Sequence, residues 1–190
     1  MLDASLMTDN LYFNKVREEQ CKDMEISEIA LRISECADII YFSARKLGSA
    51  KGGGIVVDDK TLFDQMKVLI PIYEGFLTYG GMSTREMEAV AVGLEEATDM
   101  DMISHGPEFI AEFGRILQEY NVPIVTPTGG LGLHINAREF VGHINPYEYQ
   151  SASLAAAIYL VSGVRGMERG TLSEERNADG SEHIASCELG

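Results

Sequence analysis

The sequence has few basic residues and no long hydrophobic run. Lys and Arg number 15 against 30 Asp and Glu, which gives a formal net charge of −15. A surface of that sign repels nucleic acid and anionic membranes, so we expect neither as a partner. No apolar stretch approaches the ~20 residues of a membrane-spanning helix. The first residues also lack the basic and then apolar layout of a secretory signal peptide.

Cysteine is scarce as well. The three cysteines, Cys21, Cys36 and Cys187, are odd in number and none belongs to a C-x-x-C pair. This pattern disfavours a disulfide framework and a zinc site, and we expect free thiols in a reducing, cytoplasmic location. At 190 residues and 45% hydrophobic content, the chain can form one large domain or two small ones with a sizeable core.

What the sequence does contain is a stretch rich in cations and glycine, between two apolar runs. Residues 43–54 are Ser-Ala-Arg-Lys-Leu-Gly-Ser-Ala-Lys-Gly-Gly-Gly. The runs at 39–42 and 55–57 predict buried strands on either side. Loops at strand ends carry much of the chemistry of α/β proteins. Glycines there allow the backbone to approach a ligand closely and to present N–H groups to an anion.

Three interpretations of this stretch compete. The first is a tight turn on a solvated edge with Arg45 and Lys46 exposed, because four-residue matches arise by chance. The second is the Ser-x-x-Lys site of penicillin-binding enzymes, but the Ser-Asp-Asn and Lys-Thr-Gly tripeptides that it also needs are absent. The third is a lysine that binds pyridoxal phosphate (PLP), in which Ser43, three residues before Lys46, holds the phosphate.

Hydrophobic periodicity predicts helices in the first half of the chain. Apolar residues at 26, 29, 30 and 33 indicate a helix with one buried face, and Ser27 is its predicted cap. A second amphipathic helix is expected to stop before Pro71. Ser83 and Glu86 have the spacing of a capping box, which starts a helix that runs to about Thr98.

In the second half, proline and glycine mark the predicted boundaries. Pro107 is predicted as the first residue of a helix that ends near Tyr120. Short strands are expected at 122–125 and 131–135. Asn145 and Pro146 open a last helix, for which Gly163 is a C-terminal cap. The tail at 173–190 is polar and is predicted as a loop.

Several motifs occur in an order that is far more specific than any one of them. They are Leu2-Asp3-Ala4-Ser5, Ala37-Asp38, Ser43-Ala44-Arg45-Lys46, Tyr79-Gly80-Gly81, Arg85-Glu86-Met87-Glu88-Ala89 and Gly163-Val164-Arg165-Gly166-Met167-Glu168-Arg169-Gly170. In this order and spacing the chain resembles the aromatic amino acid β-eliminating lyases, the family of tyrosine phenol-lyase and tryptophanase. The resemblance extends almost from end to end.

The resemblance implies an α/β fold of the PLP-dependent, aspartate-aminotransferase-like (fold type I) architecture. Residues 1–98 would be the C-terminal part of the PLP-binding large domain. Residues 99–190 would be a truncated small C-terminal domain of α+β type. The chain then corresponds to an internal to C-terminal segment of a longer enzyme. We expect such a segment to bind PLP weakly and to have little or no activity alone.

The resemblance also implies a set of cofactor and catalytic residues. Lys46 would bind PLP and remove the α-proton of the substrate. Asp3 would pair with the pyridine nitrogen and keep the ring electron-poor, and Ser43 and Arg45 would bind the phosphate. Tyr79 would donate a proton to the leaving group. From residue type alone, Asp3 is equally a helix cap or a solvated terminal charge, and Tyr79 a surface tyrosine in a turn.

Some positions depart from the family pattern. Phe42, Arg45 and Leu47 replace a Met, a Lys and an Asp of the family's lysine segment, and Leu6 stands where the family has an arginine near the cofactor. Lys51 stands where the family has an asparagine at a monovalent-cation position. Its ammonium group can take over the role of potassium, or it can be an exposed lysine on a glycine-rich turn. If the family ligand is the backbone carbonyl of this residue, the ion can still bind. We therefore assign no side chain to a metal, and potassium is a doubtful cofactor.

The substrate-binding residues implied by the resemblance are Arg169, Phe76 and Met167. Arg169 resembles the tyrosine phenol-lyase version of its motif, where an arginine meets the phenolic oxygen, and an ion pair with Glu168 is the alternative. The expected reaction cleaves tyrosine or tryptophan to phenol or indole with pyruvate and ammonia, in a homotetramer when full length. Two rival functions are a non-catalytic remnant that serves as an interaction module and another fold type I PLP enzyme such as an aldolase.

Overall fold

The computed structural model describes residues 1–48, 50–170 and 177–181. The chain divides into two compact units, Met1–Gly106 and Pro107–Gly190. The division lies after the boundary predicted near Asp99, and the assignment of the units to a large and a small domain stays a prediction. Cys187 and most of the predicted polar tail lie outside the described residues. Cys21 and Cys36 lie within them, and both are free thiols.

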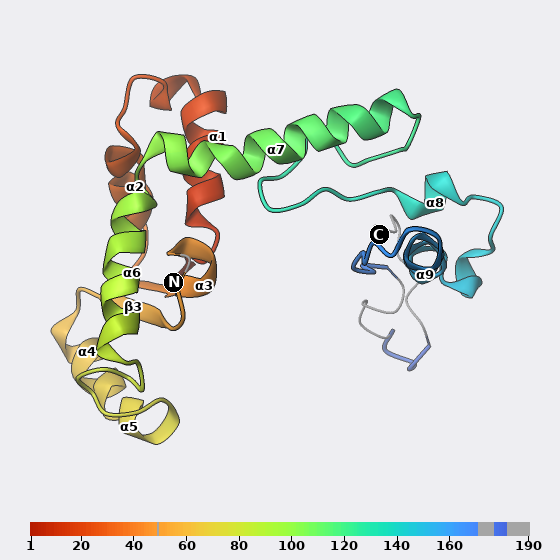
Figure 1. Ribbon diagram of the computed structural model, residues 1–190. Helices are drawn as coiled ribbons and strands as arrows, with labels where there is room; N and C mark the ends of the chain where they lie inside the picture. The colour runs from red at the N-terminus through yellow and green to blue at the C-terminus, as the bar shows by residue number, and fades with distance from the viewer. Residues whose placement is uncertain (49, 171–176, 182–190) are drawn as a thin grey trace. The chain divides into compact units, whose positions relative to one another are not determined.

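The first unit combines a small sheet with helices (Figure 1). Its elements are β1 (Leu2–Asp3), α1 (Met7–Arg17), η1 (Glu19–Cys21), α2 (Ile26–Ser34), β2 (Ile39–Ser43), α3 (Ala44–Leu47), β3 (Gly53–Val57), α4 (Lys60–Lys67), α5 (Ile70–Tyr73) and α6 (Thr84–Glu96). The strands on both sides of the glycine-rich stretch are thus confirmed, and the fold is mixed α/β. The prediction that these strands are buried is wrong, since no residue of β2 or β3 is buried and Ile55 and Val56 are each 53% exposed.

Within the described part of the chain, the strands form a sheet of order β1-β2-β3. β1 is parallel to β2, with Asp3 opposite Tyr41. β3 is antiparallel to β2, with Tyr41 opposite Ile55 and Ser43 opposite Gly53. Because side chains alternate along a strand, Asp3, Tyr41 and Ser43 lie on one face of this sheet. Ile40 and Phe42 lie on the other face.

The core of the first unit forms where α1 and α2 pack together and cover the Ile40 and Phe42 face of the sheet. Leu11 of α1 is 1% exposed and Ile29 of α2 is 2% exposed. Met7, Ile26 and Ile103 belong to the same cluster. Leu11 is among the largest fully buried side chains in the described residues. This apolar packing fixes the sheet, and so it fixes the opposite face on which Asp3 lies.

Two of the predicted helix boundaries in the first unit need comment. The capping box of α6 is confirmed, since Ser83 N–H donates to Glu86 Oε2 at 2.8 Å and Glu86 N–H donates to Ser83 Oγ at 3.2 Å. The predicted cap Ser27 is wrong, because α2 begins at Ile26 with Glu25 as its N-cap. Glu25 N–H donates to the Glu28 carboxylate at 2.9 Å, which satisfies the amide of the N-cap residue.

α7 (Met100–Glu119) begins about two turns earlier than predicted, so Pro107 lies inside the helix and is not its first residue. Asp99 explains the earlier start, because its carboxylate accepts a hydrogen bond from Asp101 N–H at 2.9 Å. Its carbonyl accepts from Ile103 N–H at 3.0 Å. These bonds satisfy amides of the first turn. The division between the two units falls at Gly106 and Pro107.

The second unit also contains α8 (Ala137–Phe140), η2 (Pro146–Glu148) and α9 (Gln150–Ser162). The strands predicted at 122–125 and 131–135 reduce to an isolated antiparallel bridge between Ile124 and Ile135. The C-terminal cap predicted for the last helix is confirmed, since Gly163 has a left-handed φ of 73°. In the part of the chain that the structure describes, no helix is both long and apolar enough to span a lipid bilayer.

Candidate functional site

Lys46 lies on α3, the single helical turn that follows β2. This turn replaces part of the predicted loop. Ala44 is fully buried at the start of α3, whereas the side chains of Arg45 and Lys46 are exposed. Ala44 N–H donates to the Gly52 carbonyl at 3.0 Å, and Ala50 N–H donates to the Ala44 carbonyl at 2.9 Å. The backbone therefore holds the two cations at a fixed place at the end of β2.

The carboxylate of Asp3 lies at the edge of the sheet beside Tyr41. Ser5 N–H donates a hydrogen bond to Asp3 Oδ1 at 2.9 Å. Hydrogen bonds from the hydroxyl and the backbone of Ser5, then from Tyr41, and the charge of Lys46 lower the pKa of the Asp3 carboxyl. The nearby Asp3 charge in turn raises the pKa of the Tyr41 phenol. Asp3 is thus held as an anion within the field of the Lys46 ammonium group.

Ser5 connects the Asp3 turn to the strand that delivers Lys46. Its side chain is 7% exposed, and its Oγ accepts a hydrogen bond from Ser43 N–H at 3.0 Å. The buried serine therefore fixes the position of Asp3 relative to the end of β2. Ser5 and Tyr41 were missed as site residues. Ser5 occurs in a resembling motif, but nothing in the sequence indicates which strand pairs with residues 2–3.

The glycines at the end of the central stretch have a structural role. A Cβ on Gly53 would lie 2.3 Å from the Phe42 carbonyl oxygen, and one on Gly54 would lie 2.7 Å from the Phe42 ring. Both glycines belong to β3, so they allow β2 and β3 to pair closely. Gly52, with a φ of 93°, makes the turn into β3. The predicted approach of a ligand to these glycines has no support in this geometry.

Tyr79 and Phe76 lie together in the segment between α5 and α6. Their ring centroids are 5.9 Å apart, and both side chains are exposed. This segment lies against the turn after α3, because a Cβ on Gly52 would come within 2.5 Å of the Met82 sulfur. The structure therefore places the Tyr79 turn next to the stretch that contains Lys46, although no contact between Tyr79 and Lys46 is described.

Lys51 is exposed on the same turn. Hydrogen bonds from the backbone and the side chain of Ser83 lower the pKa of Glu86, and the charge of Lys51 lowers it further by a smaller amount. Lys51 thus lies within electrostatic reach of the first turn of α6. Among the described residues, no group of three or more His, Cys, Asp or Glu side chains could hold a metal ion.

Arg169 and Met167 belong to the second unit, and both are exposed. Between them, Glu168 Oε1 accepts a hydrogen bond from Gly170 N–H at 2.5 Å. Gly170 packs on α9, since a Cβ there would come within 2.7 Å of Ser151 Oγ. These contacts order the segment that carries Arg169. That Arg169 meets a substrate beside Lys46 stays a prediction.

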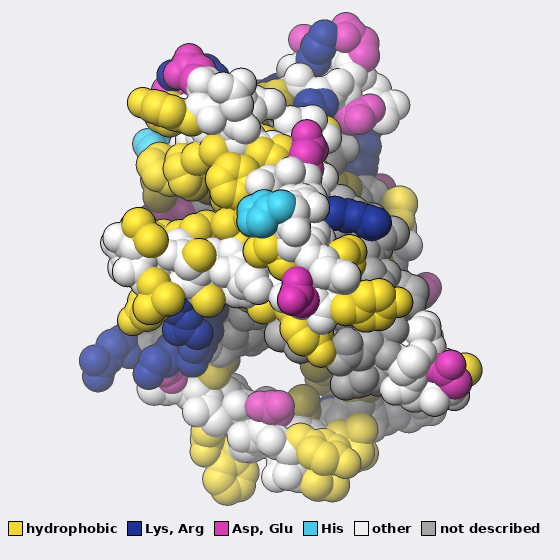
Figure 2. Space-filling view, turned by 90° about the vertical axis from the view of Figure 1, so that its right-hand side faces the viewer, with side chains coloured by type: hydrophobic (Ala, Val, Ile, Leu, Met, Phe, Trp, Pro, Cys, Tyr) yellow, Lys and Arg dark blue, Asp and Glu magenta, His cyan; other side chains and the backbone are white. Residues whose placement is uncertain are grey.

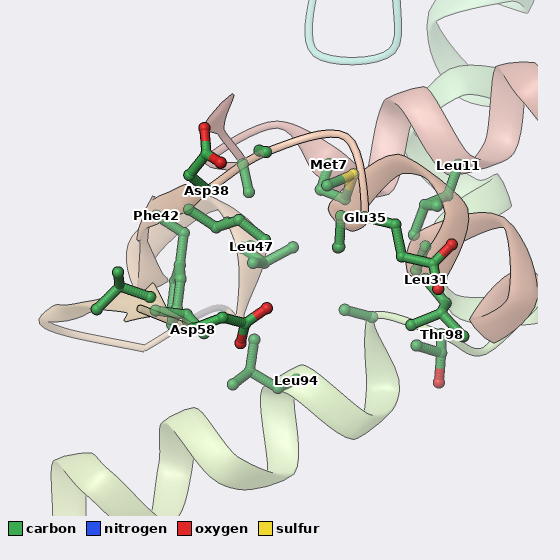
Figure 3. A pocket seen from close by; sticks show the side chains of 18 residues that line it. Met7, Leu11, Leu31, Glu35, Asp38, Phe42, Leu47, Asp58, Leu94 and Thr98 are labelled. Atoms are coloured by element: carbon green, nitrogen blue, oxygen red, sulfur yellow. The ribbon is translucent and has the colours of Figure 1, made fainter. Parts of the chain in front are cut away.

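A cavity of about 450 Å³ lies on the opposite face of the sheet from Asp3. Its lining is mostly apolar and includes Ile40, Phe42, Leu47 and Leu94. Figure 3 shows Leu47 from α3 and Leu94 from α6 among the side chains around it. Its lining contains neither Asp3 nor Lys46. We therefore assign the candidate site to the polar face, the side of the sheet that carries Asp3, Tyr41 and Ser43 next to Lys46.

The chemistry of the polar face fits PLP. An exposed amine on Lys46 can bond to an aldehyde carbon, and the anionic Asp3 can accept a hydrogen bond from a protonated ring nitrogen. Ser43 and Arg45, at the junction of β2 and α3, are a hydroxyl and a guanidinium that can bind phosphate oxygens. Because these groups come from β1, β2 and α3, the fold and not the local sequence brings them together.

Comparison with known proteins gives an independent result. No protein-family model matches the chain. A tryptophanase of Salinibacter ruber is 38% identical over 190 residues, which is 100% of this chain and 40% of that protein. A tyrosine phenol-lyase of Clostridium tetani is 37% identical over 182 residues, 95% of this chain and 40% of that protein. A probable β-eliminating lyase of Trichomonas vaginalis is 35% identical over 178 residues, 93% of this chain and 39% of that protein.

These relatives agree with the resemblance drawn from the motifs. Nearly the whole chain is similar to each of them, and the chain spans about 40% of their length. Their names include both tryptophanase and tyrosine phenol-lyase at similar identity.

Proposed function

We propose, from the premise that this chain is homologous to one segment of the aromatic amino acid β-eliminating lyases, that it carries the lysine segment of a PLP-dependent lyase. The proposed architecture is fold type I, with residues 1–98 in a large domain and 99–190 in a small one. The proposed reaction cleaves an aromatic amino acid to pyruvate, ammonia and phenol or indole. In the whole protein, the proposed assembly is a homo-oligomer.

The observation that carries the proposal is the parallel pairing of β1 with β2, which places Asp3 opposite Tyr41 on the strand that leads directly into α3 and Lys46. Asp3 and Lys46 are far apart in the sequence, and the charge of Lys46 makes a small contribution to the lowered pKa of the Asp3 carboxyl. PLP chemistry needs this combination of an amine for the aldehyde and an anion for the ring nitrogen. A surface turn with two exposed cations, the simplest alternative for this stretch, does not require an aspartate on the neighbouring strand whose carboxylate accepts a hydrogen bond from Ser5 N–H at 2.9 Å.

Each residue of the polar face then has a role. PLP supplies an electron-poor ring that stabilises negative charge at the α-carbon. Lys46 holds the cofactor and afterwards takes the α-proton with its Nζ. Asp3 keeps the proton on the ring nitrogen, because a carboxyl of lowered pKa gives up that proton readily. Ser43 and Arg45 bind the phosphate and fix the orientation of the ring.

The substrate side is proposed from the resemblance and from residue chemistry. Tyr79 gives a proton to the leaving group, and Phe76, which lies against it, and Met167 contact the aromatic ring. Arg169 donates a charge-assisted hydrogen bond to a phenolic oxygen, which favours tyrosine over tryptophan as the substrate. Lys51 takes the place of a monovalent cation, because an ammonium group and a bound cation repel each other at ~4 Å.

The first prediction tests the proposed cofactor lysine. Mixing the chain with PLP should change the absorbance of PLP, and borohydride, which makes the lysine linkage permanent, should label the peptide that contains Lys46. Lys46→Arg should abolish the labelling, because arginine keeps the positive charge but cannot form the linkage. We expect weak binding and little turnover from this chain.

Two control variants separate site labelling from random labelling of exposed lysines. Lys51→Arg and Lys60→Arg should leave the labelling of Lys46 intact. Labelling confined to Lys51 or Lys60 would contradict the assignment. Labelling that is spread over all exposed lysines and that scales only with the PLP concentration would favour the non-catalytic alternative.

A further inference from the structure

Tyr41 lies at the centre of the polar face, although no role has so far been given to it. It is opposite Asp3 in the parallel pairing of β1 with β2. On its other side it is opposite Ile55 in the antiparallel pairing with β3. Residues that are directly opposite in a sheet point to the same face. The ring of Tyr41 therefore lies beside the Asp3 carboxylate, on the face away from the core.

The ring of Tyr41 contributes little to that core. The side chain is 37% exposed, and its neighbour Ile55 is 53% exposed. The Tyr41 phenol contributes to the lowered pKa of the Asp3 carboxyl, and the Asp3 charge raises the pKa of the phenol, as expected for two groups that are directly opposite in the sheet. The other groups that act on Asp3 are Ser5, through two hydrogen bonds, and Lys46, through its charge. Ser5 fixes the carboxylate from the turn, and Tyr41 is the partner that reaches it from the neighbouring strand.

We propose that Tyr41 is the positioning residue for Asp3, and that its phenol holds the carboxylate in the orientation in which it receives the ring nitrogen of PLP. The inference rests on the proposed function, because it assigns Asp3 to the cofactor. Tyr41 itself acts through Asp3 and touches no reacting atom. Since a carboxylate has two oxygens with room for several donors, it can accept from Ser5 and Tyr41 and still pair with a protonated ring nitrogen.

Two consequences distinguish this role from ordinary strand packing. Loss of the phenol leaves the carboxylate with fewer donors, so the Asp3 carboxyl becomes easier to protonate. The carboxylate can also rotate about its side-chain torsions, so fewer molecules have it in the orientation that the ring nitrogen needs. If Tyr41 served only to pack the sheet, loss of its hydroxyl would change neither the pKa of Asp3 nor the orientation of its carboxylate.

The second prediction is first tested without any cofactor. In Tyr41→Phe, which keeps the ring and removes only the hydroxyl, the pKa of Asp3 should rise toward the ordinary value of 3.8, followed by NMR of the labelled carboxyl carbon. In Asp3→Asn, the pKa of Tyr41 should fall toward 10.0, followed by tyrosinate absorbance. Tyr159→Phe, at an exposed position of α9, is the matched control and should leave Asp3 unchanged.

The same variants are then titrated with PLP. Tyr41→Phe should weaken PLP binding about fivefold, the order expected for losing one hydrogen bond of typical net strength. In an Asp3→Ala background, Tyr41→Phe should change the affinity by less than about twofold, because its effect passes through the carboxylate. Circular dichroism of each variant checks that the sheet and the helices are retained.

The outcomes separate this inference from the proposed function. If the wild-type chain forms no borohydride-stable linkage at Lys46, the proposed function fails and the role of Tyr41 fails with it. If wild type is labelled at Lys46 but Tyr41→Phe binds PLP as wild type does, only the positioning role is overturned. An unchanged Asp3 pKa in Tyr41→Phe overturns it too, as does a loss of affinity of equal size with and without Asp3.

Discussion

The lack of a side chain at Gly93 allows α6 to pack closely against the end of α3. A Cβ on Gly93 of α6 would lie 2.1 Å from the Gly48 carbonyl oxygen, which belongs to the backbone and cannot rotate away. A Cβ on Gly48 would lie 3.6 Å from the nearest atom of Gly93, at ordinary van der Waals distance. The contact is therefore asymmetric, and only one of the two glycines is required by it.

The third prediction follows from this asymmetry. Gly93→Ala should destabilise the first unit by about 1–3 kcal/mol through overpacking, even though alanine favours a helix by about 1 kcal/mol. Gly48→Ala, the matched control, should be neutral or slightly stabilising. Urea unfolding followed by far-UV circular dichroism measures both. Equal stability of the two variants would mean that α3 and α6 do not approach as closely as described.

At the scale of residues, the sequence indicated some of the site and missed its supporting contacts. Lys46 and Asp3 were identified because their motifs resemble those of a known family. Ser5 and Tyr41 were not, because their roles depend on the pairing of β1 with β2. No local pattern indicates which distant strand residues 2–3 will join. The glycines at 53 and 54 were interpreted as a ligand contact because their clash with Phe42 appears only once β3 is paired.

At the scale of elements, capping geometry explains both the correct and the incorrect helix boundaries. Ser83 and Glu86 exchange hydrogen bonds at the start of α6, as their spacing predicted. At α2 the same function is performed by Glu25 and Glu28, and glutamate is not a typical cap residue. For α7, Asp99 caps a helix that starts about two turns before Pro107. In these two cases a side chain just before the observed start decides the boundary.

The fourth prediction compares Ser83, whose predicted role as a helix cap is confirmed, with Ser27, whose predicted role as a cap is wrong. Ser83→Ala should destabilise the chain by about 1 kcal/mol, because Glu86 N–H loses its acceptor at the start of α6. Ser27→Ala should stay within about 0.5 kcal/mol of wild type or stabilise it slightly, since Ser27 is exposed inside α2 and alanine is the better helix former. Thermal and urea unfolding measure the stability of both variants. If Ser27→Ala lost more stability than Ser83→Ala, Ser27 would be the cap of α2 after all.

At the scale of the whole molecule, several large apolar side chains on amphipathic helices are exposed. Phe63 of α4 is 46% exposed and Phe113 of α7 is 44% exposed. In α9, the buried positions are Gln150, Ser151 and Leu154. Periodicity identifies which face of a helix is apolar, but it contains no information on what covers that face. For α9, the pattern favours Ala155, Ala156 and Ile158 as packing residues, but Ala156 is exposed and the other two are only half-buried.

The exposed apolar side chains and the net charge act against each other in solution. Figure 2 shows hydrophobic side chains in several clusters on one face of the molecule. Among the most exposed are Leu160 and Val161 of α9 and Ile72 of α5, at 83%, 89% and 70%. Apolar surface of this kind favours association, whereas a net charge of −15 keeps identical chains apart. At 0.1 M salt, the repulsion between exposed charges more than about 10 Å apart is largely screened. The attraction between apolar surfaces remains.

The fifth prediction is therefore that the chain self-associates as salt is added. Sedimentation velocity should show mainly monomer at low ionic strength and larger species at several times that ionic strength. A dye that reports exposed apolar surface should fluoresce with the chain at low salt and less after association. The double variant Leu160→Ser, Val161→Ser should weaken both signals, because it removes two of the most exposed apolar side chains of the described residues. A monomer at every salt concentration that leaves the dye dark would contradict the prediction, because the apolar surface would then be covered within the chain itself.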